Sequence, residues 1–255
     1  MSLPNFSLTG KVALVTGGRQ GIGKTIALAF AEAGADVAVC DLVVDDGQIR
    51  TVVEEIQRRG RQSMGLQTDT SKKTDVDHLV QKVIRQLGVI DILVNNAGIL
   101  IRSPILDLAE KDWDQLLGVD LKGYFLCAQA VGRKMVEQRK GCIINIASQF
   151  AFKVGPGMGA YSVAKAGVVM LTRVLAQELG GFGIRTNTIA PAMVKTEFSR
   201  PSWSDPASLK QIEASIPLGR AAETTDLVGA ALFLASDASC YVTGHTLLVD
   251  GGILA

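Results

Sequence analysis

Short apolar runs alternate with longer segments of helical periodicity along almost the whole chain, and this alternation constrains the fold more than any other feature. The apolar runs predict seven strands, at residues 12–16, 37–40, 63–67, 92–94, 142–146, 184–189 and 246–249. The helical segments between and around them are at 22–33, 52–59, 76–87, 113–138, 161–179 and 227–235. Strands separated by helices are typical of βαβ units. The sequence therefore predicts an α/β fold, with a three-layer, doubly wound parallel sheet of seven strands.

Charge and composition exclude several classes of protein. The chain has 26 Lys and Arg against 25 Asp and Glu, and it lacks the basic excess that a nucleic-acid binder needs to neutralise phosphates. No apolar run approaches the ~18 residues of a membrane span, and we find no signal-peptide pattern. The four cysteines are widely separated, so we expect buried thiols in a reduced, cytoplasmic protein. The two histidines belong to no ligand motif, so we expect neither a metal site nor a Ser-His-Asp triad.

No linker or repeat divides the chain, and we expect one domain over residues 1–255. Only residues 196–219, which contain three prolines, break the alternation of strands and helices. A long insertion after the carboxyl end of a strand in such a sheet lies over the ligand crevice. We interpret this segment as a substrate lid; the alternative is a plain surface loop with a short helix.

A glycine-rich segment follows the first predicted strand and fits two kinds of nucleotide site. Gly17, Gly21 and Gly23 stand between a strand and a helix, where backbone N–H groups can approach a pyrophosphate at the positive helix terminus. The same residues also satisfy the P-loop pattern G-x-x-x-x-G-K-[ST], which would place Lys24 on phosphates and Thr25 on Mg²⁺. The segment alone does not decide between a dinucleotide site and a nucleotide hydrolase.

Asp41 ends the second predicted strand, 18 residues beyond Gly23. At this position of a dinucleotide fold, a carboxylate accepts hydrogen bonds from the adenosine ribose and repels the 2′-phosphate of NADP. Leu42 follows in place of an arginine, which favours NAD. Arg19 is the counter-argument, because a basic residue in the glycine-rich segment can face the same phosphate.

Tyr161 and Lys165 are four residues apart and therefore share one face of a predicted helix. A neighbouring ammonium lowers the pKa of a phenol, as does the positive charge of oxidised nicotinamide, so the pair suits general acid/base catalysis. Ser148 follows the strand at 142–146 and can hydrogen-bond the same substrate oxygen. Asn95 to Gly98 close another strand with small residues that let the backbone approach a cofactor.

The joint occurrence of these motifs resembles the short-chain dehydrogenase/reductase family in its ~250-residue form. The resemblance runs from end to end and includes residues 16–23, Asp69, 95–98, Ser148, Tyr161 with Lys165, and 187–196. It implies a Rossmann-type fold, a homotetramer, and an NAD-dependent enzyme in which Tyr161 is the general acid/base, while the P-loop match becomes coincidental. The implied cofactor contacts are Gly17, Arg19, Gln20, Gly21, Ile22, Gly23, Asp41, Leu42, Asp69, Thr70, Asn96, Ala97, Gly98, Tyr161, Lys165, Pro191, Val194 and Thr196.

One departure from the family falls in the catalytic set. Asp120 stands where the family usually has an asparagine that holds a water in a proton relay to the lysine. We therefore count Asp120 with Ser148, Tyr161 and Lys165 and expect an active enzyme with a shifted pH profile. A cofactor-binding regulator that has lost catalysis is the remote alternative. Ala192, after Pro191, replaces the family's common glycine and is a small perturbation.

The substrate is the least constrained feature. The C-terminal segment and residues 95–104 look most like gluconate 5-dehydrogenases and related sugar-acid enzymes, in which an arginine matching Arg102 binds the substrate carboxylate. We expect a sugar acid or polyol, with Arg102 on the surface as the alternative. Phe150, Met193 and Trp203 suit a hydrophobic cyclic alcohol or an acyl chain of the 3-oxoacyl type instead. The expected substrate contacts are Arg102, Ser148, Gln149, Phe150, Met193 and Trp203; Phe152 is expected in the core.

Overall fold

A computed structural model describes residues 5–255, and its centre is a seven-stranded sheet in the order β3-β2-β1-β4-β5-β6-β7. Every neighbouring pair is parallel. The predicted doubly wound sheet is confirmed, and each strand lies within two residues of its predicted bounds. The strands are β1 Val12–Thr16, β2 Asp36–Asp41, β3 Ser63–Gln67, β4 Ile92–Asn95, β5 Gly141–Ile146, β6 Ile184–Pro191 and β7 Thr246–Val249.

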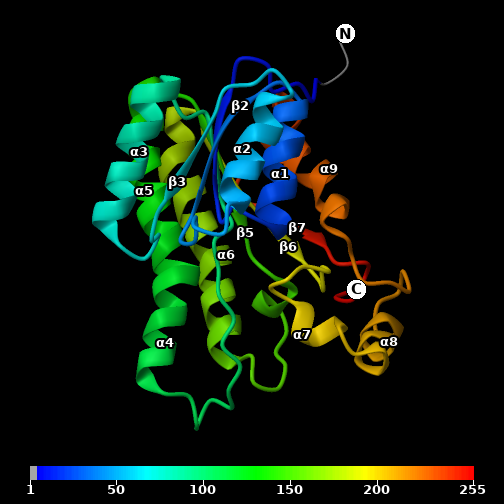
Figure 1. Cartoon of the computed structure of the whole chain (residues 1–255). Helices are drawn as coiled ribbons and strands as arrows, with labels where there is room; N and C mark the ends of the chain where they lie inside the picture. The colour runs from blue at the N-terminus through cyan, green and yellow to red at the C-terminus, as the bar shows by residue number, and fades with distance from the viewer. Residues whose placement is uncertain (1–4) are drawn as a thin grey trace.

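Helices cover both faces of the sheet (Figure 1). One face carries α1 Gly21–Glu32, α2 Gln48–Gln57 and α9 Val228–Ala235, and the other carries α3 Lys73–Leu87, α5 Gly123–Gln138 and α6 Gly159–Leu179. The helix predicted at 113–138 is α4 Glu110–Leu117, a π-helical turn at Gly118–Lys122, and α5 in succession. Central strands covered on both faces read as continuous apolar runs, which explains why β1 is buried at every position.

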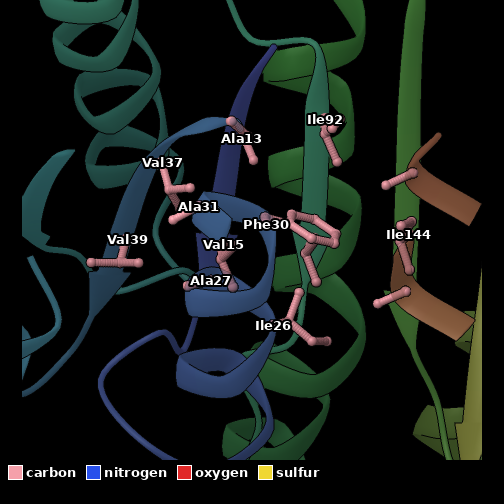
Figure 2. Packing of buried hydrophobic residues seen from close by; sticks show 14 of the residues in the cluster. Ala13, Val15, Ile26, Ala27, Phe30, Ala31, Val37, Val39, Ile92 and Ile144 are labelled. Atoms are coloured by element: carbon pink, nitrogen blue, oxygen red, sulfur yellow. The ribbon is translucent and has the colours of Figure 1, made fainter. Parts of the chain in front are cut away.

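The core consists of two apolar layers on opposite faces of the sheet. Because successive side chains of a strand point to opposite faces, Ala13 and Val15 of β1 face α1, where they meet Phe30 (Figure 2). Val12 and Leu14 pack in the second layer, toward α3 and α5. Phe30 is fully buried, and burial of such a side chain contributes about 2–3 kcal/mol. This packing fixes the carboxyl ends of the strands, where the predicted site residues lie.

The segment after β6 contains two helices, α7 Arg200–Trp203 and α8 Pro206–Ala214 (yellow to orange in Figure 1). Pro201 and Pro206 stand in the first turns of these helices, where the missing N–H costs nothing. The Asp205 side chain accepts a hydrogen bond of 2.8 Å from the Ser208 N–H and caps α8. The segment is therefore more ordered than a plain loop with one short helix, whereas its role as a lid and the single-domain boundary stay predictions.

Three of the four cysteines are buried as predicted, and all four are free thiols. The prediction is wrong for Cys240, which is exposed because it follows a short 3₁₀ turn at the surface after α9. Within residues 5–255, no helix is long and apolar enough to cross a membrane.

Candidate active site

A cavity of about 390 Å³ opens at the carboxyl ends of the strands, within the size range of small-molecule sites. It lies where the strand order reverses between β1 and β4, which is the expected ligand position in such sheets. The predicted catalytic residues Asp120, Ser148, Tyr161 and Lys165 all line it. The predicted cofactor contacts that line it are Gly17, Arg19, Gln20, Gly21, Ile22, Asp41, Leu42, Asp69, Thr70, Asn96, Ala97, Gly98, Tyr161, Lys165, Pro191, Val194 and Thr196.

The glycine-rich segment is folded against β4 in a way that suits a pyrophosphate. Gly17 and Gly21 have φ of +63° and +55°, in the left-handed region that favours glycine. Gly23 lies beneath the turn, where an added Cβ would be 2.2 Å from the Gly17 carbonyl oxygen. The Asn96 side-chain amide donates to the carbonyls of Thr16 and Gly17, at 3.0 Å each. The turn is thus held open at the start of α1, and its residues fit a dinucleotide.

The P-loop interpretation does not agree with the structure. Lys24 forms an ion pair with Glu55 at 2.9 Å, and the Thr25 hydroxyl donates to the Thr224 hydroxyl at 2.8 Å. Neither Lys24 nor Thr25 lines the cavity. The two side chains that would bind phosphates and Mg²⁺ in a hydrolase are therefore used in contacts of α1 with its neighbours.

The end of the cavity beside β2 carries three charged side chains. The Arg19 guanidinium lies 3.6 Å from the Asp41 carboxylate and also contacts Asp46. The single cation is shared between two carboxylates, which leaves this corner with a net negative charge. Farther along, burial opposes ionisation of Asp69, but hydrogen bonds from Ser71 and Lys72 outweigh it and hold the pKa of Asp69 below its usual value.

Tyr161 and Lys165 lie on one face of α6, as predicted, and Ser148 lies just beyond the end of β5. Burial raises the pKa of Tyr161 to about 12, against the opposing effects of the Lys165 charge and of Ser148. Lys165 Nζ is 5.5 Å from the centroid of the Tyr161 ring. A phenol in this position holds its proton in the empty protein and needs a further positive charge nearby to release it.

Three groups hold the Lys165 ammonium. Its Nζ contacts Asp120 Oδ2 at 3.2 Å and donates hydrogen bonds to the Tyr124 hydroxyl at 3.1 Å and to the Ile146 carbonyl at 3.2 Å. Sequence reasoning missed Tyr124, although its position four residues after Asp120 was a usable signal. Burial raises the pKa of Tyr124 well above its usual value, so its hydroxyl stays protonated and donates to the Ile146 carbonyl at 3.0 Å.

Asp120 lies in the π-helical turn between α4 and α5 and is fully buried. Its Oδ1 accepts a hydrogen bond of 2.7 Å from the Ile99 N–H, in the loop after β4. Burial raises the pKa of Asp120, while the Lys165 ammonium and the Ile99 N–H oppose that shift. The side chain thus joins the catalytic lysine to the loop that carries Arg102.

The expected substrate contacts lie at the other end of the cavity, with one exception. Arg102, Gln149, Phe150 and Met193 line it. Trp203 does not, because its indole N–H donates to the Thr196 carbonyl at 3.1 Å and to the Ser199 hydroxyl at 3.2 Å within the 196–219 segment. The structure therefore corrects this placement, and it also leaves Gly23 beneath the cavity wall.

Sequence reasoning missed several apolar residues at the same end of the cavity. Phe198 and Phe150 flank Tyr161, each with its ring centroid 6.3 Å from that of Tyr161. Leu100 and Met158 add to the wall. The position of Phe198 two residues after Thr196 was the available signal. Phe152, expected in the core, is instead 48% exposed, because it follows the 3₁₀ turn that holds Phe150 at the cavity.

Comparison with known proteins places this geometry among dehydrogenases. Residues 17–254 match a family model described as enoyl-(acyl carrier protein) reductase. The chain is 44% identical to the (2S)-[(R)-hydroxy(phenyl)methyl]succinyl-CoA dehydrogenase subunit of Thauera aromatica, over 97% of this chain and 98% of that protein. It is 39% identical to the 2-dehydro-3-deoxy-D-gluconate 5-dehydrogenase of Dickeya dadantii, over the full length of both.

A solved structure extends the likeness to three dimensions. The gluconate 5-dehydrogenase of Burkholderia cenocepacia, determined in complex with NADP and tartrate, superposes with a TM-score of 0.94 at 37% identity, over 98% of each chain. Both the sequence and the fold therefore agree with the motifs at the cavity, and the chain belongs to the short-chain dehydrogenase/reductase family of oxidoreductases.

Proposed function

We propose that the protein interconverts a secondary alcohol and a ketone with NAD(H), and that Tyr161 is the general acid/base. The observation that carries the proposal is the convergence of Ser148, Tyr161 and Lys165 on one cavity that the glycine-rich turn also lines. The cofactor, when bound, supplies a hydride acceptor for the alcohol carbon or a hydride donor for the ketone carbon. The chain itself handles the proton.

In the direction of alcohol oxidation, the Tyr161 phenolate takes the hydroxyl proton of the substrate while the hydride leaves its carbon. The Ser148 hydroxyl donates a hydrogen bond to the substrate oxygen, and its own oxygen accepts one from the Phe150 N–H at 3.2 Å. Lys165 stabilises the phenolate through its charge and is held for this by Asp120 and Tyr124. In ketone reduction, Tyr161 returns the proton to the oxygen.

The test of this mechanism is the Tyr161→Phe variant. It keeps the ring between Phe150 and Phe198 but lacks the exchangeable proton. We expect NADH binding, followed by fluorescence, to stay close to that of the wild type while turnover falls by a factor of about 10²–10⁴. Retained turnover would refute the role of Tyr161. A wild-type protein that binds NADH but turns over no alcohol or ketone would favour the silent regulator instead.

We assign NAD rather than NADP as the preferred cofactor. The support is the corner beside β2, where Arg19 is already shared between Asp41 and Asp46 and a 2′-phosphate would meet net negative charge. NADP in the Burkholderia structure shows that the alternative exists among relatives. The ratio of Kd values for NADPH and NADH measures the preference, and Asp41→Asn should lower that ratio by at least about tenfold, the scale of one charge interaction near a protein surface.

The substrate proposal is an alcohol that also carries a carboxylate, which Arg102 binds. The Dickeya relative acts on 2-dehydro-3-deoxy-D-gluconate, which supports a sugar acid or polyol. The Thauera relative acts on (2S)-[(R)-hydroxy(phenyl)methyl]succinyl-CoA, which supports the alternative of a hydrophobic cyclic alcohol or acyl chain. Loss of affinity for acids in Arg102→Ala, with NADH binding unchanged, tests the role of Arg102.

We further propose a homotetramer built through α4, α5, α6 and β7, in the cytoplasm. Large apolar side chains on these elements are exposed in the single chain, at Phe125, Val163, Met170, Val174 and Leu248. Their coverage by other copies would remove this apolar surface from water. The free thiols support a reducing compartment. Light scattering with Met170→Glu tests the assembly, because a charge in the contact should yield smaller species.

A further inference from the structure

We infer that the substrate is an aryl hydroxy acid: a secondary alcohol whose carbon carries a flat, apolar ring on one side and a short chain ending in a carboxylate on the other. This inference rests on the proposed function and deepens it by choosing between the two substrate classes left open above. It depends on two features of the cavity beyond the reactive groups, namely an aromatic wall around Tyr161 and a single cation that no carboxylate neutralises.

The aromatic wall is built from two separate parts of the chain. Phe150 comes from the turn after β5 and meets Tyr161 edge-to-face, with an interplanar angle of 76°. Phe198 comes from the 196–219 segment and meets Tyr161 from another direction, at 45°. Phe198 is 41% exposed although it lies beside the most buried phenol of the site, so a ligand ring is the natural cover for this surface.

Apolar side chains extend this wall away from the reactive oxygen. Leu100, Met158 and Met193 line the same end of the cavity. Thioether and phenyl groups pack well against a flat ring but offer no hydrogen bonds to hydroxyl groups. A polyol chain placed here would lose hydrogen bonds to water without replacement, whereas an aryl group would gain from leaving water.

Arg102 supplies the second feature. Three cations line the cavity; Arg19 contacts Asp41 and Asp46, and Lys165 contacts Asp120. Arg102 differs, because no carboxylate of residues 5–255 lies within 4.0 Å of its guanidinium. Its one side-chain hydrogen bond in the described chain goes to the hydroxyl of Ser202 in α7, a neutral acceptor. Most of its N–H donors thus remain for a ligand carboxylate.

The acidic groups of the cavity do not compete for this cation. Glu197, the carboxylate from the 196–219 segment, contacts Arg200 at 3.1 Å and is solvent-exposed. Asp69 contacts Lys72 at 3.1 Å near the cofactor end. The substrate end therefore combines one available positive charge with an apolar aromatic wall, and a ligand must satisfy both at once.

Four substrates separate the two features. We would measure kcat/KM with NAD for 3-hydroxy-3-phenylpropionate, which has ring and carboxylate; 1-phenylethanol, which has the ring alone; 3-hydroxybutyrate, which has the carboxylate alone; and gluconate, a sugar acid. We expect the first to exceed each of the other three by at least about tenfold, the scale of one charged hydrogen bond or one buried ring.

Variants assign each gain to its residue. Arg102→Gln should remove the advantage of 3-hydroxy-3-phenylpropionate over 1-phenylethanol, and Phe198→Leu should reduce its advantage over 3-hydroxybutyrate. Phe152→Leu is the matched control, because Phe152 is a nearby exposed phenylalanine that does not line the cavity, and it should change neither ratio. Higher kcat/KM for gluconate, or equal values for 1-phenylethanol and the aryl acid, would overturn the inference while the proposed function stands.

A binding measurement keeps the inference separate from the proposed function. Calorimetric titration of 3-hydroxy-3-phenylpropionate into the NADH-saturated protein reports affinity without turnover. Binding that Arg102→Gln weakens by at least about tenfold, in a protein that turns over none of the four alcohols, would uphold the inference and refute the function. Absence of both binding and turnover for the aryl acid would overturn the inference.

Discussion

Replacing Asp120 with asparagine should shift the pH dependence of alcohol oxidation to lower pH. The buried carboxylate raises the pKa of Tyr161, and the Lys165 ammonium lowers it. Asp120→Asn removes the first effect and releases the ammonium from its ion pair, so both changes favour the phenolate. The asparagine carbonyl can still accept the hydrogen bond from the Ile99 N–H, which keeps the loop in place.

The size of the shift follows from two contacts that share Lys165. Nζ is 3.2 Å from the carboxylate and 5.5 Å from the Tyr161 ring centroid, so the carboxylate lies within about 9 Å of that ring. At an effective dielectric constant of about 20, unit charges at that distance interact by about 2 kcal/mol. Allowing for relaxation of the site, the apparent pKa of oxidation should fall by about one unit.

The assay is the pH profile of kcat/KM for NADH formation with the best alcohol of the panel. The increase in tyrosinate absorbance with pH, corrected by Tyr161→Phe, gives the pKa of Tyr161 without a substrate. Asp114→Asn is the control for removal of one charge, because Asp114 is exposed on the adjoining helix α4. An unchanged or higher apparent pKa in Asp120→Asn would refute the reasoning.

Three further substitutions test other contacts. Tyr124→Phe removes the hydroxyl that joins Lys165 to the Ile146 carbonyl; we expect a loss of about 1 kcal/mol in the free energy of unfolding in urea and a lower kcat at constant KM for NAD, and an unchanged kcat would show that Tyr124 does not position Lys165. Gly23→Ala places a methyl group 2.2 Å from the Gly17 carbonyl, so NADH fluorescence titration should show binding weakened by at least about tenfold in a protein with native circular dichroism; wild-type affinity would mean that the turn is free to move. Phe30→Ala empties the layer between α1 and the sheet and should cost about 3–5 kcal/mol in urea unfolding, while a loss below about 1 kcal/mol would contradict the packing in Figure 2.

The elements that the sequence predicted well are those whose signals are local. Each strand is a short apolar run ended by glycine or a polar residue, because both faces of the sheet are covered and every position must be apolar. The spacing of Tyr161 and Lys165 predicted a shared helix face, since four residues make about one turn. The segment at 196–219 was less clear, because its proline-rich helices are short and weakly amphipathic.

Contacts between distant segments were outside the reach of such signals. Only the fold brings Asp120 against Lys165, Phe198 against Tyr161, and Arg102 against Ser202, across 45, 37 and 100 residues. The same contacts decided that Lys24 pairs with Glu55 and does not face the cavity, and that Trp203 is held within its own segment.

The sequence by itself thus determined the parallel sheet, the order of its strands' neighbours in the chain, and the set of reactive side chains, because local periodicity and motif spacing encode them. The tertiary structure alone decided which charges remain available for a ligand. Ion pairing and burial depend on distances in space between residues far apart in the chain, and these distances leave Arg102 without a carboxylate partner in the described chain while Arg19 and Lys165 are neutralised.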